Sequence, residues 1–563
     1  MTESRTGAEY LAHTLDAYGV THAFVVPTIL TSTLIAMDEQ TRIERVVTHS
    51  EAGAAYMADG YARSSGRIGV CGAQNVGRAN LAAALQDPYL ANSPVLALTG
   101  GPLPSSRARH FYQEVDALPM FRATTKSSVH LESIDRLPQV LHQAVRDATT
   151  GRPGPVHIEL EGHAGELIET ADTDAAPPDD ARWGSAAPLR PHADPAQIRV
   201  AADAIARAER PVIVAGGGVR TSGAVAELRV LAETAGIPVA TSMNGKETFP
   251  ADHPLSVGVV GLYSRKSANQ VIAQADLVVY VGSMTSSQVT LNWTVPTVDT
   301  VVVHIDIDPA ELGRHYPRTV PILADARAGL TALHQALADR PARDLAAWRD
   351  AVRALGEAWS DETAELRTSD AVPMRPERIV NELQRSLPAD SIVVADTGHA
   401  GMWTAGFLDL QDGQGFLRAA GSLGWGLPAA IGAQLGAPDR RVVLFTGDGG
   451  FWYHVAELET AVRWNIPVII VVNDNHALNQ EVRPYTRAYG GALRGRHHEL
   501  WHFEQIDLAA LAETMGATGI RVERPGDLAA ALERAYACTG PVVIDAISDR
   551  EALAPLGFNP AQP

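Results

Sequence analysis

The chain has 563 residues, of which 46% are hydrophobic and 20% charged, and its formal net charge is −19. This composition is typical of a large globular protein with several cores. The negative charge and the lack of a basic stripe argue against nucleic-acid binding. No apolar run reaches the roughly 20 residues that span a bilayer, and the N-terminus lacks the pattern of a secretion signal. We therefore predict a cytoplasmic protein without a membrane or nucleic-acid partner.

Predicted helices and strands alternate through the first 170 residues. A helix is predicted at 51–63, and apolar β-rich runs predict strands at 22–26, 68–72, 95–99 and 156–160. This alternation is typical of a doubly wound α/β domain with a parallel sheet.

The length of the chain predicts three such units. Residues 171–191 separate the first from the second, since they are rich in Asp, Ala and Pro and have the composition of a linker. A central domain is predicted at 192–350, with strands at 211–215, 277–281 and 301–307. A third domain is predicted at 370–548. Residues 549–563 form either a lid over a long substrate or a disordered tail. The fold class is α/β, with three doubly wound parallel-sheet domains.

The most specific pattern lies between Arg440 and Asn475, where strand, glycine turn, helix and strand follow one another. Strands are expected at 442–445 and 468–472, with a helix beginning near Trp452. Neighbouring parallel strands bring their C-terminal ends together, so Asp448 and Asn475 should converge as oxygen ligands for Mg²⁺. Glycines suit the close approach of a phosphate to the backbone and to a helix start; here they are Gly447, Gly449 and Gly450.

This unit resembles the fingerprint of the thiamine diphosphate (ThDP) enzymes, which is GDG, a helix and a closing Asn pair. The chain departs from it by reading Asp474-Asn475. The resemblance points to the branch with acetolactate synthase, oxalyl-CoA decarboxylase and 2-hydroxyacyl-CoA lyase. It implies a pyrimidine-binding first domain, a nucleotide-binding-like central domain and a diphosphate-binding third domain. It also implies the backbone carbonyl of Ala477 as a third metal ligand.

The same resemblance assigns further cofactor residues. Glu51 would engage the pyrimidine nitrogen, although Ser50 stands where relatives often carry His. Leu423 would hold the cofactor bent, and the backbone of Gly421 would accept a hydrogen bond from its amino group. The loop that helps to bind the diphosphate would consist of Gly398, His399 and Ala400.

The candidate substrate residues match the family motifs less closely than the cofactor residues do. Gln113 matches a family glutamine near the reacting carbon, Phe111 would wall the pocket, and Glu481 is a candidate acid–base residue. Thr28 and Ile29 replace a glycine-rich segment of the synthases and would add bulk. Arg494 and Arg496 follow the metal motif, where they would either meet CoA phosphates or belong to a solvated loop.

The central domain resembles the unit that holds FAD in acetolactate synthase or ADP in oxalyl-CoA decarboxylase. Glycines and carboxylates that follow strands suit phosphate turns and ribose hydroxyls. FAD, ADP and an empty site all remain open. The candidate residues are Gly217, Gly218, Arg220, Arg265, Asp306 and Asp308.

The leading prediction is a ThDP- and Mg²⁺-dependent lyase that cleaves a 2-hydroxyacyl-CoA to formyl-CoA and a ketone or aldehyde. It depends on HALNQEVRPY (476–485), which replaces the GMVxQW stretch of the synthases. The alternatives are an acetolactate-synthase-like carboligase, a 2-ketoacid decarboxylase, and a non-catalytic relative that binds a nucleotide or a partner. The resemblance implies a homodimer or homotetramer with active sites between subunits.

Overall fold

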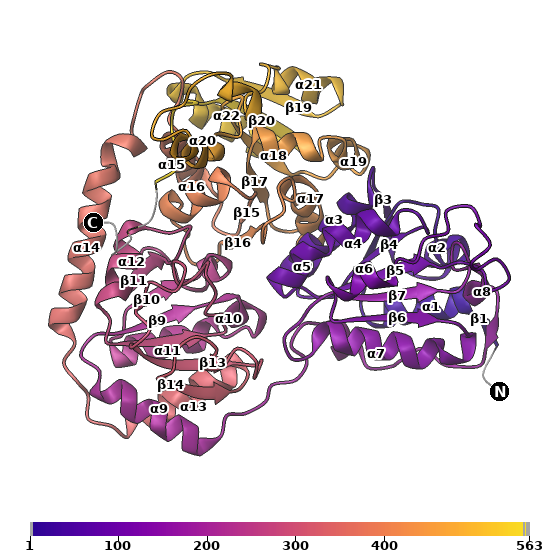
Figure 1. Ribbon diagram of the computed structural model, residues 1–563, viewed down its shortest axis with the longest axis horizontal. Helices are drawn as coiled ribbons and strands as arrows, with labels where there is room; N and C mark the ends of the chain where they lie inside the picture. Colours follow the sequence, from indigo (N-terminus) through magenta and orange to yellow (C-terminus); the bar gives the residue numbers. More distant parts are fainter. Residues whose placement is uncertain (1–3, 556–557, 559–563) are drawn as a thin grey trace.

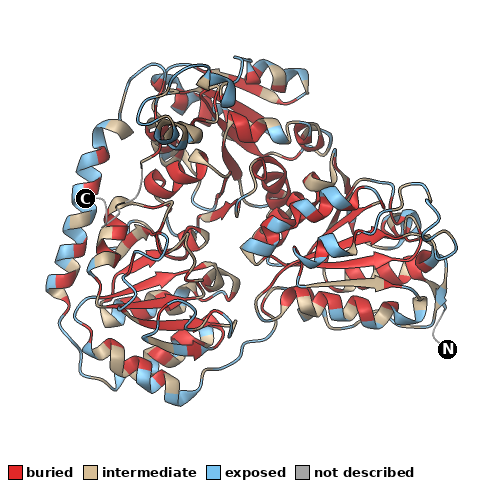
Figure 2. Ribbon diagram, viewed as in Figure 1, coloured by how far each residue is buried: buried red, intermediate tan, exposed pale blue. Residues whose placement is uncertain are grey.

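A computed structural model describes residues 4–555 and 558, and it divides the chain into three α/β domains (Figure 1). Each domain has a six-stranded parallel sheet. The central strands are buried on both faces, while the outward faces of the helices are exposed (Figure 2). The predicted fold class is therefore confirmed. No helix in the described part of the chain is both long and apolar enough to cross a membrane.

The N-terminal domain has the strand order β3-β2-β4-β5-β7-β6. The predicted helix at 51–63 is α3 (Glu51–Ser65), and the strands predicted there agree with the structure within one or two residues at each end. The strands are β2 (His22–Val25), β3 (Glu44–Val47), β4 (Gly69–Ala73), β5 (Val95–Gly100), β6 (Ser127–Leu131) and β7 (Val156–Leu160); the other main helices are α1 (Gly7–Ala17), α2 (Thr31–Gln40), α4 (Arg78–Ala84), α5 (Gln86–Ala91) and α7 (Leu137–Thr149).

The C-terminal domain repeats this arrangement, with the order β16-β15-β17-β18-β20-β19. Its first strand in the chain also lies second in the sheet, so the two domains have the same topology. Its strands are β15 (Ile392–Ala395), β16 (Gly415–Arg418), β17 (Val442–Gly447), β18 (Ile469–Asp474), β19 (Thr518–Val522) and β20 (Val542–Ile547); its main helices are α15 (Pro376–Ser386), α16 (His399–Phe407), α17 (Gly426–Gly436), α18 (Asp448–Tyr453), α19 (Glu457–Arg463), α21 (Leu508–Thr514) and α22 (Leu528–Ala537).

The central domain differs, because its order β11-β10-β9-β12-β13-β14 is the arrangement of dinucleotide-binding sheets. The long helix α14 (Ala346–Arg367) leads from it to the C-terminal domain (Figure 1). Its strands are β9 (Pro211–Ala215), β10 (Val239–Thr241), β11 (Ser256–Val259), β12 (Leu277–Val281), β13 (Val301–Asp306) and β14 (Thr319–Leu323); its other helices are α9 (Pro195–Arg207), α10 (Gly217–Thr221), α11 (Val225–Ala235), α12 (Lys266–Gln274) and α13 (Ala326–Ala338).

Helices α3 and α17 join the N-terminal and C-terminal domains by close backbone packing (Figure 1). A Cβ atom on Gly60 would lie 2.0 Å from the carbonyl oxygen of Ala429, and one on Gly432 would lie 1.9 Å from that of Met57. Both positions therefore require glycine. This contact fixes the start of α3, where Glu51 lies.

The segments outside the sheets are partly ordered. Within the predicted linker, β8 (Asp172–Thr173) pairs with β1 (Arg5–Thr6). In the C-terminal segment, Ala552 and Ala554 are buried in the core of the third domain. Asn479 donates hydrogen bonds to the carbonyl oxygens of Arg550 and Ala552. Residues 549–555 are thus packed, and most of the remaining predicted lid lies outside the described residues.

Candidate functional site

The register of β17 and β18 places the acidic residues of the GDG unit side by side. Gly447 pairs with Asn473, so Asp448 and Asp474 follow at the same sheet edge. Helix α18 begins at Asp448 rather than near Trp452, because β17 continues to Gly447 and the chain passes directly from strand to helix. Gly449 and Gly450 permit this: their Cβ atoms would lie 2.4 Å from Leu478 Cδ2 and 2.6 Å from Asp396 Oδ2.

A cavity of about 420 Å³ opens above this edge. Apart from Glu51, every residue that the sequence assigned to the cofactor lines it, as do the predicted metal ligand Ala477 and the acid–base candidate Glu481. A Cβ on Gly447 would contact nothing within 4 Å, so its backbone is open to a ligand. The cofactor residues are Gly398, His399, Ala400, Gly421, Leu423, Gly447, Asp448, Gly449, Gly450 and Asn475.

Three side chains in this region have the arrangement of a cation site. Ligand atoms of Asp448, Asp474 and His476 lie within 4.8 Å of one another. Asp448 Oδ2 is buried and has no hydrogen-bond partner among the described residues. The carboxyl of Asp474 lies against that of Asp545, with which it shares a hydrogen bond. Buried carboxylate oxygens need a partner, and a divalent cation would supply it. The site therefore fits Mg²⁺.

The predicted ligands Asn475 and Ala477 lie beside these groups. Asn475 Oδ1 accepts a hydrogen bond of 3.1 Å from the Ala477 N–H, and both residues line the cavity. The sequence reasoning missed Asp474 and His476. The sequence feature that could have indicated Asp474 is the departure from an Asn pair. An aspartate at that position adds a second negative charge beside Asp448.

Metal binding at this site should depend on pH. Burial, followed by the charge of Asp474, raises the pKa of Asp448 to about 8. A raised pKa means that the metal-free carboxyl is mostly protonated at pH 7, and a protonated carboxyl cannot ligate. Mg²⁺ affinity should therefore fall about tenfold per pH unit below about 8 and level off above it. Calorimetry in buffers of different ionisation enthalpy should detect the released proton; pH-independent affinity would contradict this protonation state.

The diphosphate side of the cavity is formed by the start of α16. Gly398 precedes this helix with φ 77°, a conformation that favours glycine. Burial lowers the pKa of His399 to about 4, so the ring is neutral at pH 7, and its Nδ1 lies 2.6 Å from Asn479 Oδ1. The diphosphate would therefore meet backbone N–H groups and a neutral imidazole at this helix start.

Asp87, which the sequence reasoning missed, holds the opposite wall. Its buried carboxylate accepts hydrogen bonds from the backbone N–H groups of Ala420, Gly421 and Ser422, at 2.7, 3.2 and 2.9 Å. The N–H groups of this loop are thereby occupied, which leaves the Gly421 carbonyl as the acceptor that the resemblance requires.

Comparison with known proteins agrees with this geometry. Family models match residues 5–120 (thiamine pyrophosphate enzyme, N-terminal TPP binding domain), 198–333 (central domain) and 396–546 (C-terminal TPP binding domain). A probable acetolactate synthase large subunit from Methanocaldococcus jannaschii is 34% identical over 98% of this chain and 93% of its own. This chain belongs to the thiamine pyrophosphate enzymes. Acetolactate synthase isozyme 2 large subunit of Escherichia coli is 31% identical over 98% of this chain and 97% of its own.

The position of Glu51 in this ThDP enzyme is set by its neighbours. Ser50 caps α3 by accepting the Gly53 N–H at 2.9 Å, which makes Glu51 the first helical residue. Asn80 donates to Glu51 Oε2 at 3.1 Å, and a Cβ on Gly77 would lie 2.4 Å from Oε1. Glu51 is not among the described residues that line the cavity of Asp448.

The predicted substrate residues separate into two groups. Phe111 and Gln113 lie together, because the Phe111 ring packs against His163 and Gln113 bonds to Gln74, which also contacts His163. Thr28 is exposed, whereas Ile29 is fully buried in the N-terminal core. The expectation that Ile29 narrows the substrate site is therefore wrong, since its side chain points into the sheet packing.

The two arginines predicted to meet CoA lie on the surface. Arg494 is exposed and lies over the Tyr489 ring at 5.8 Å. Arg496 is 83% exposed and pairs with Glu499 at 3.4 Å. Neither is among the described residues that line the cavity. The arrangement favours the solvated-loop interpretation of this basic stretch.

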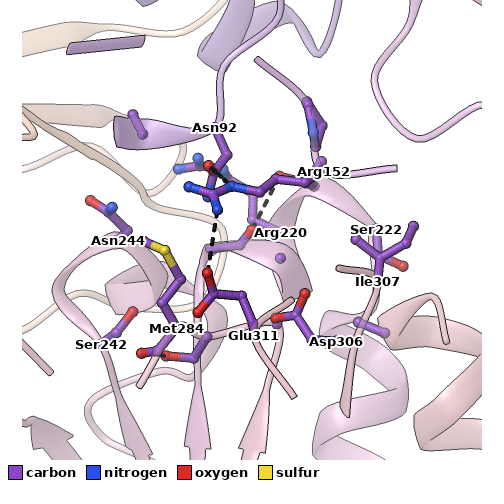
Figure 3. A pocket seen from close by; sticks show the side chains of 18 of the residues that line it. Asn92, Arg152, Arg220, Ser222, Ser242, Asn244, Met284, Asp306, Ile307 and Glu311 are labelled. Carbon is purple, nitrogen blue, oxygen red and sulfur yellow. Dashed lines mark hydrogen bonds and ion pairs between the residues drawn. The ribbon is translucent and has the colours of Figure 1, made fainter. Parts of the chain in front are cut away.

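The central domain contains a second, smaller cavity of about 140 Å³ (Figure 3). Gly217, Gly218, Arg220 and Asp306 line it as predicted. Arg265 lies elsewhere, where it pairs with Asp409 of the third domain. Asp308 faces an adjoining groove.

Arg152 reaches into the central cavity from the N-terminal domain (Figure 3). It donates to Asn92 Oδ1 at 2.5 Å and lies 3.4 Å from Glu311 Oε1. Burial raises the pKa of Asp306 to about 6, and this carboxyl follows β13 at the sheet edge where ribose hydroxyls bind in such folds. Ligand pockets usually have roughly 300 Å³ or more, so a nucleotide would need side chains of this cavity to move.

Proposed function

We propose that this chain is a ThDP- and Mg²⁺-dependent carboligase acting on 2-ketoacids, in the manner of the acetolactate synthases. The observation that carries the proposal is the full-length similarity to acetolactate synthase large subunits, of which that from Corynebacterium glutamicum is 31% identical over 98% of this chain. It favours the carboligase alternative over the acyl-CoA lyase that the sequence first indicated.

The described site supports the same choice. A CoA thioester would need cations at the mouth of the cavity, and the two predicted arginines are solvated. A 2-ketoacid needs only a small pocket with a hydrogen-bond donor for its carboxylate. Gln113, beside Phe111 and His163, provides a side-chain amide of this kind.

Each residue of the proposed site has a separate role. Asp448 and its neighbours hold Mg²⁺, and the backbone of Gly447 and the start of α16 bind the diphosphate. Leu423 would support the bound cofactor, while Glu51 would bind its pyrimidine nitrogen and hold a proton there. Bound ThDP would supply a carbon nucleophile for the carbonyl group of a ketoacid. Gln113 orients the ketoacid.

The test is an assay of purified protein with ThDP and Mg²⁺. Two pyruvates should give one acetolactate and one CO₂. Because residues 476–485 depart from the synthase motif, the panel includes longer 2-ketoacids as donor and acceptor. Cleavage of a 2-hydroxyacyl-CoA without turnover of any 2-ketoacid would contradict the proposal and restore the lyase.

Two copies of the chain would complete each site. Val76, one residue before the Gly77 that contacts Glu51, is 52% exposed, and Tyr112, whose ring lies 6.4 Å from that of His163, is 74% exposed. Next to the cavity, an apolar hollow is lined by Leu478, Phe503 and Ile506. Large exposed apolar patches mark interfaces. We therefore propose a homodimer, alone or within a homotetramer, in which Glu51 of one subunit faces the cofactor held by the other.

The central cavity is proposed to take an adenine nucleotide, either FAD or ADP, with Asp306 accepting ribose hydroxyls. The support is the strand order and the position of this carboxylate. Denaturing the purified protein should release the ligand, and its spectrum distinguishes a flavin from an adenine alone. No release, and no binding of added FAD or ADP, would contradict the assignment.

A further inference from the structure

A network of hydrogen-bonded polar side chains contacts Gln113, and the proposed function gives it no role so far. Gln74 Nε2 donates to Gln113 Oε1 at 3.0 Å and lies 2.8 Å from His163 Nε2. On the other side of the ring, Asn75 Nδ2 lies 3.3 Å from His163 Nδ1. These residues come from three loops, which follow β4, β5 and β7 at the same sheet edge.

This network of side chains lies close to Glu51 in the N-terminal domain. Gln74 and Asn75 precede Gly77, which contacts Glu51. Gln113 is held at φ 63°, a left-handed conformation that non-glycine residues rarely adopt. Such conformations persist where surrounding contacts fix them, and they cluster at ligand sites.

The direction of each hydrogen bond follows from the chemistry of the groups. An amide NH₂ only donates, so His163 Nε2 accepts from Gln74, and a neutral ring then carries its proton on Nδ1. Asn75 Oδ1 is buried and has no partner among the described residues. A half-turn of this amide would let Oδ1 accept from His163 Nδ1. Gln113 uses its oxygen for Gln74, which leaves its NH₂ group to face the substrate.

We propose that Gln74 and His163 are positioning residues that hold Gln113 with its NH₂ group toward the carboxylate of a 2-ketoacid. This inference rests on the proposed function. Without an acceptor at His163 Nε2, the Gln74 amide is free to turn its oxygen toward Gln113. Gln113 must then turn its NH₂ group to Gln74 and its oxygen to the substrate. An oxygen there repels a carboxylate, so loss of this acceptor weakens 2-ketoacid binding.

The charged groups around His163 are engaged with one another. Glu166 accepts the backbone N–H groups of His163 and Ala164, so it faces the backbone and not the ring. The rings of Phe111 and Tyr112 lie 5.5 and 6.4 Å from the imidazole, between ring centroids. Charged side chains on neighbouring elements form an ion-pair cluster, which consists of Arg78, Arg107, His130, Glu159 and Glu161. On the Gln113 loop, Glu114 accepts the backbone N–H of Phe111.

The test compares His163→Gln with His163→Leu in the complete enzyme. A glutamine oxygen can accept from Gln74 in place of the ring nitrogen, whereas leucine offers no acceptor. His163→Gln should keep the wild-type KM for the 2-ketoacid. His163→Leu should raise this KM about ten- to hundredfold with little change in kcat, as loss of a hydrogen bond to a charged group predicts.

The possible failures can be separated. If the wild type turns over no 2-ketoacid, the proposed function fails. If it does so and His163→Leu keeps the wild-type KM, the positioning inference fails. A measurement independent of turnover is NMR of protein labelled with ¹⁵N-histidine, with His163→Gln used for assignment. It should show the Nδ1–H tautomer at pH 8, and an Nε2–H tautomer would overturn the inference.

Discussion

Replacing Asp448 with alanine is expected to abolish the binding of Mg²⁺ and ThDP together. The substitution removes the buried carboxylate whose Oδ2 has no partner among the described residues, and it leaves Asp474 as the one carboxylate in the group of Asp448, Asp474 and His476. The affinity for ThDP in the presence of Mg²⁺ should fall by about a hundredfold or more. Titration calorimetry measures this directly.

The matched control is Asp439→Ala, which makes the same change of charge at an exposed residue just before β17. It should bind ThDP like the unmodified protein. Unchanged ThDP affinity in Asp448→Ala would refute the metal assignment.

Replacing Glu51 with glutamine should leave ThDP bound but slow the exchange of its C2 proton about a hundredfold or more, the magnitude typical of a lost acid–base group. The amide keeps the size of the side chain and its contact with Asn80, yet it cannot hold the proton that the pyrimidine nitrogen requires. Deuterium exchange at C2, followed by NMR after acid quench, is the measurement.

Glu39→Gln serves as the control, because Glu39 is an exposed residue at the end of α2. Normal exchange is expected in this variant. Near-normal exchange in Glu51→Gln as well would remove Glu51 from the mechanism.

The sequence predicted the elements that have strong local signals. β-rich apolar runs located β9, β12 and β7 to the residue, and the spacing of Asp448 and Asn475 located the cofactor cavity. These predictions succeed because parallel strands are buried on both faces and end at one edge.

The sequence did not predict the directions of side chains or the contacts between distant segments. Ile29 points into the core because of its place after β2, and Asp87 meets the loop at Ala420 across more than 300 residues of chain. Asp474 enters the cation site through the register of β17 with β18. None of these depends on a local pattern, so the sequence reasoning could not find them.

The central claim is that each active site combines Asp448 of one copy with Glu51 of another. Co-expression of Asp448→Ala and Glu51→Gln chains carrying different tags tests it most directly. If the site lies between copies, a hybrid dimer has one intact site of two, and random assortment should restore about a quarter of the unmodified activity. If both residues act within one chain, every chain in the hybrid is defective. Hybrids purified on both tags that show no activity would contradict the account.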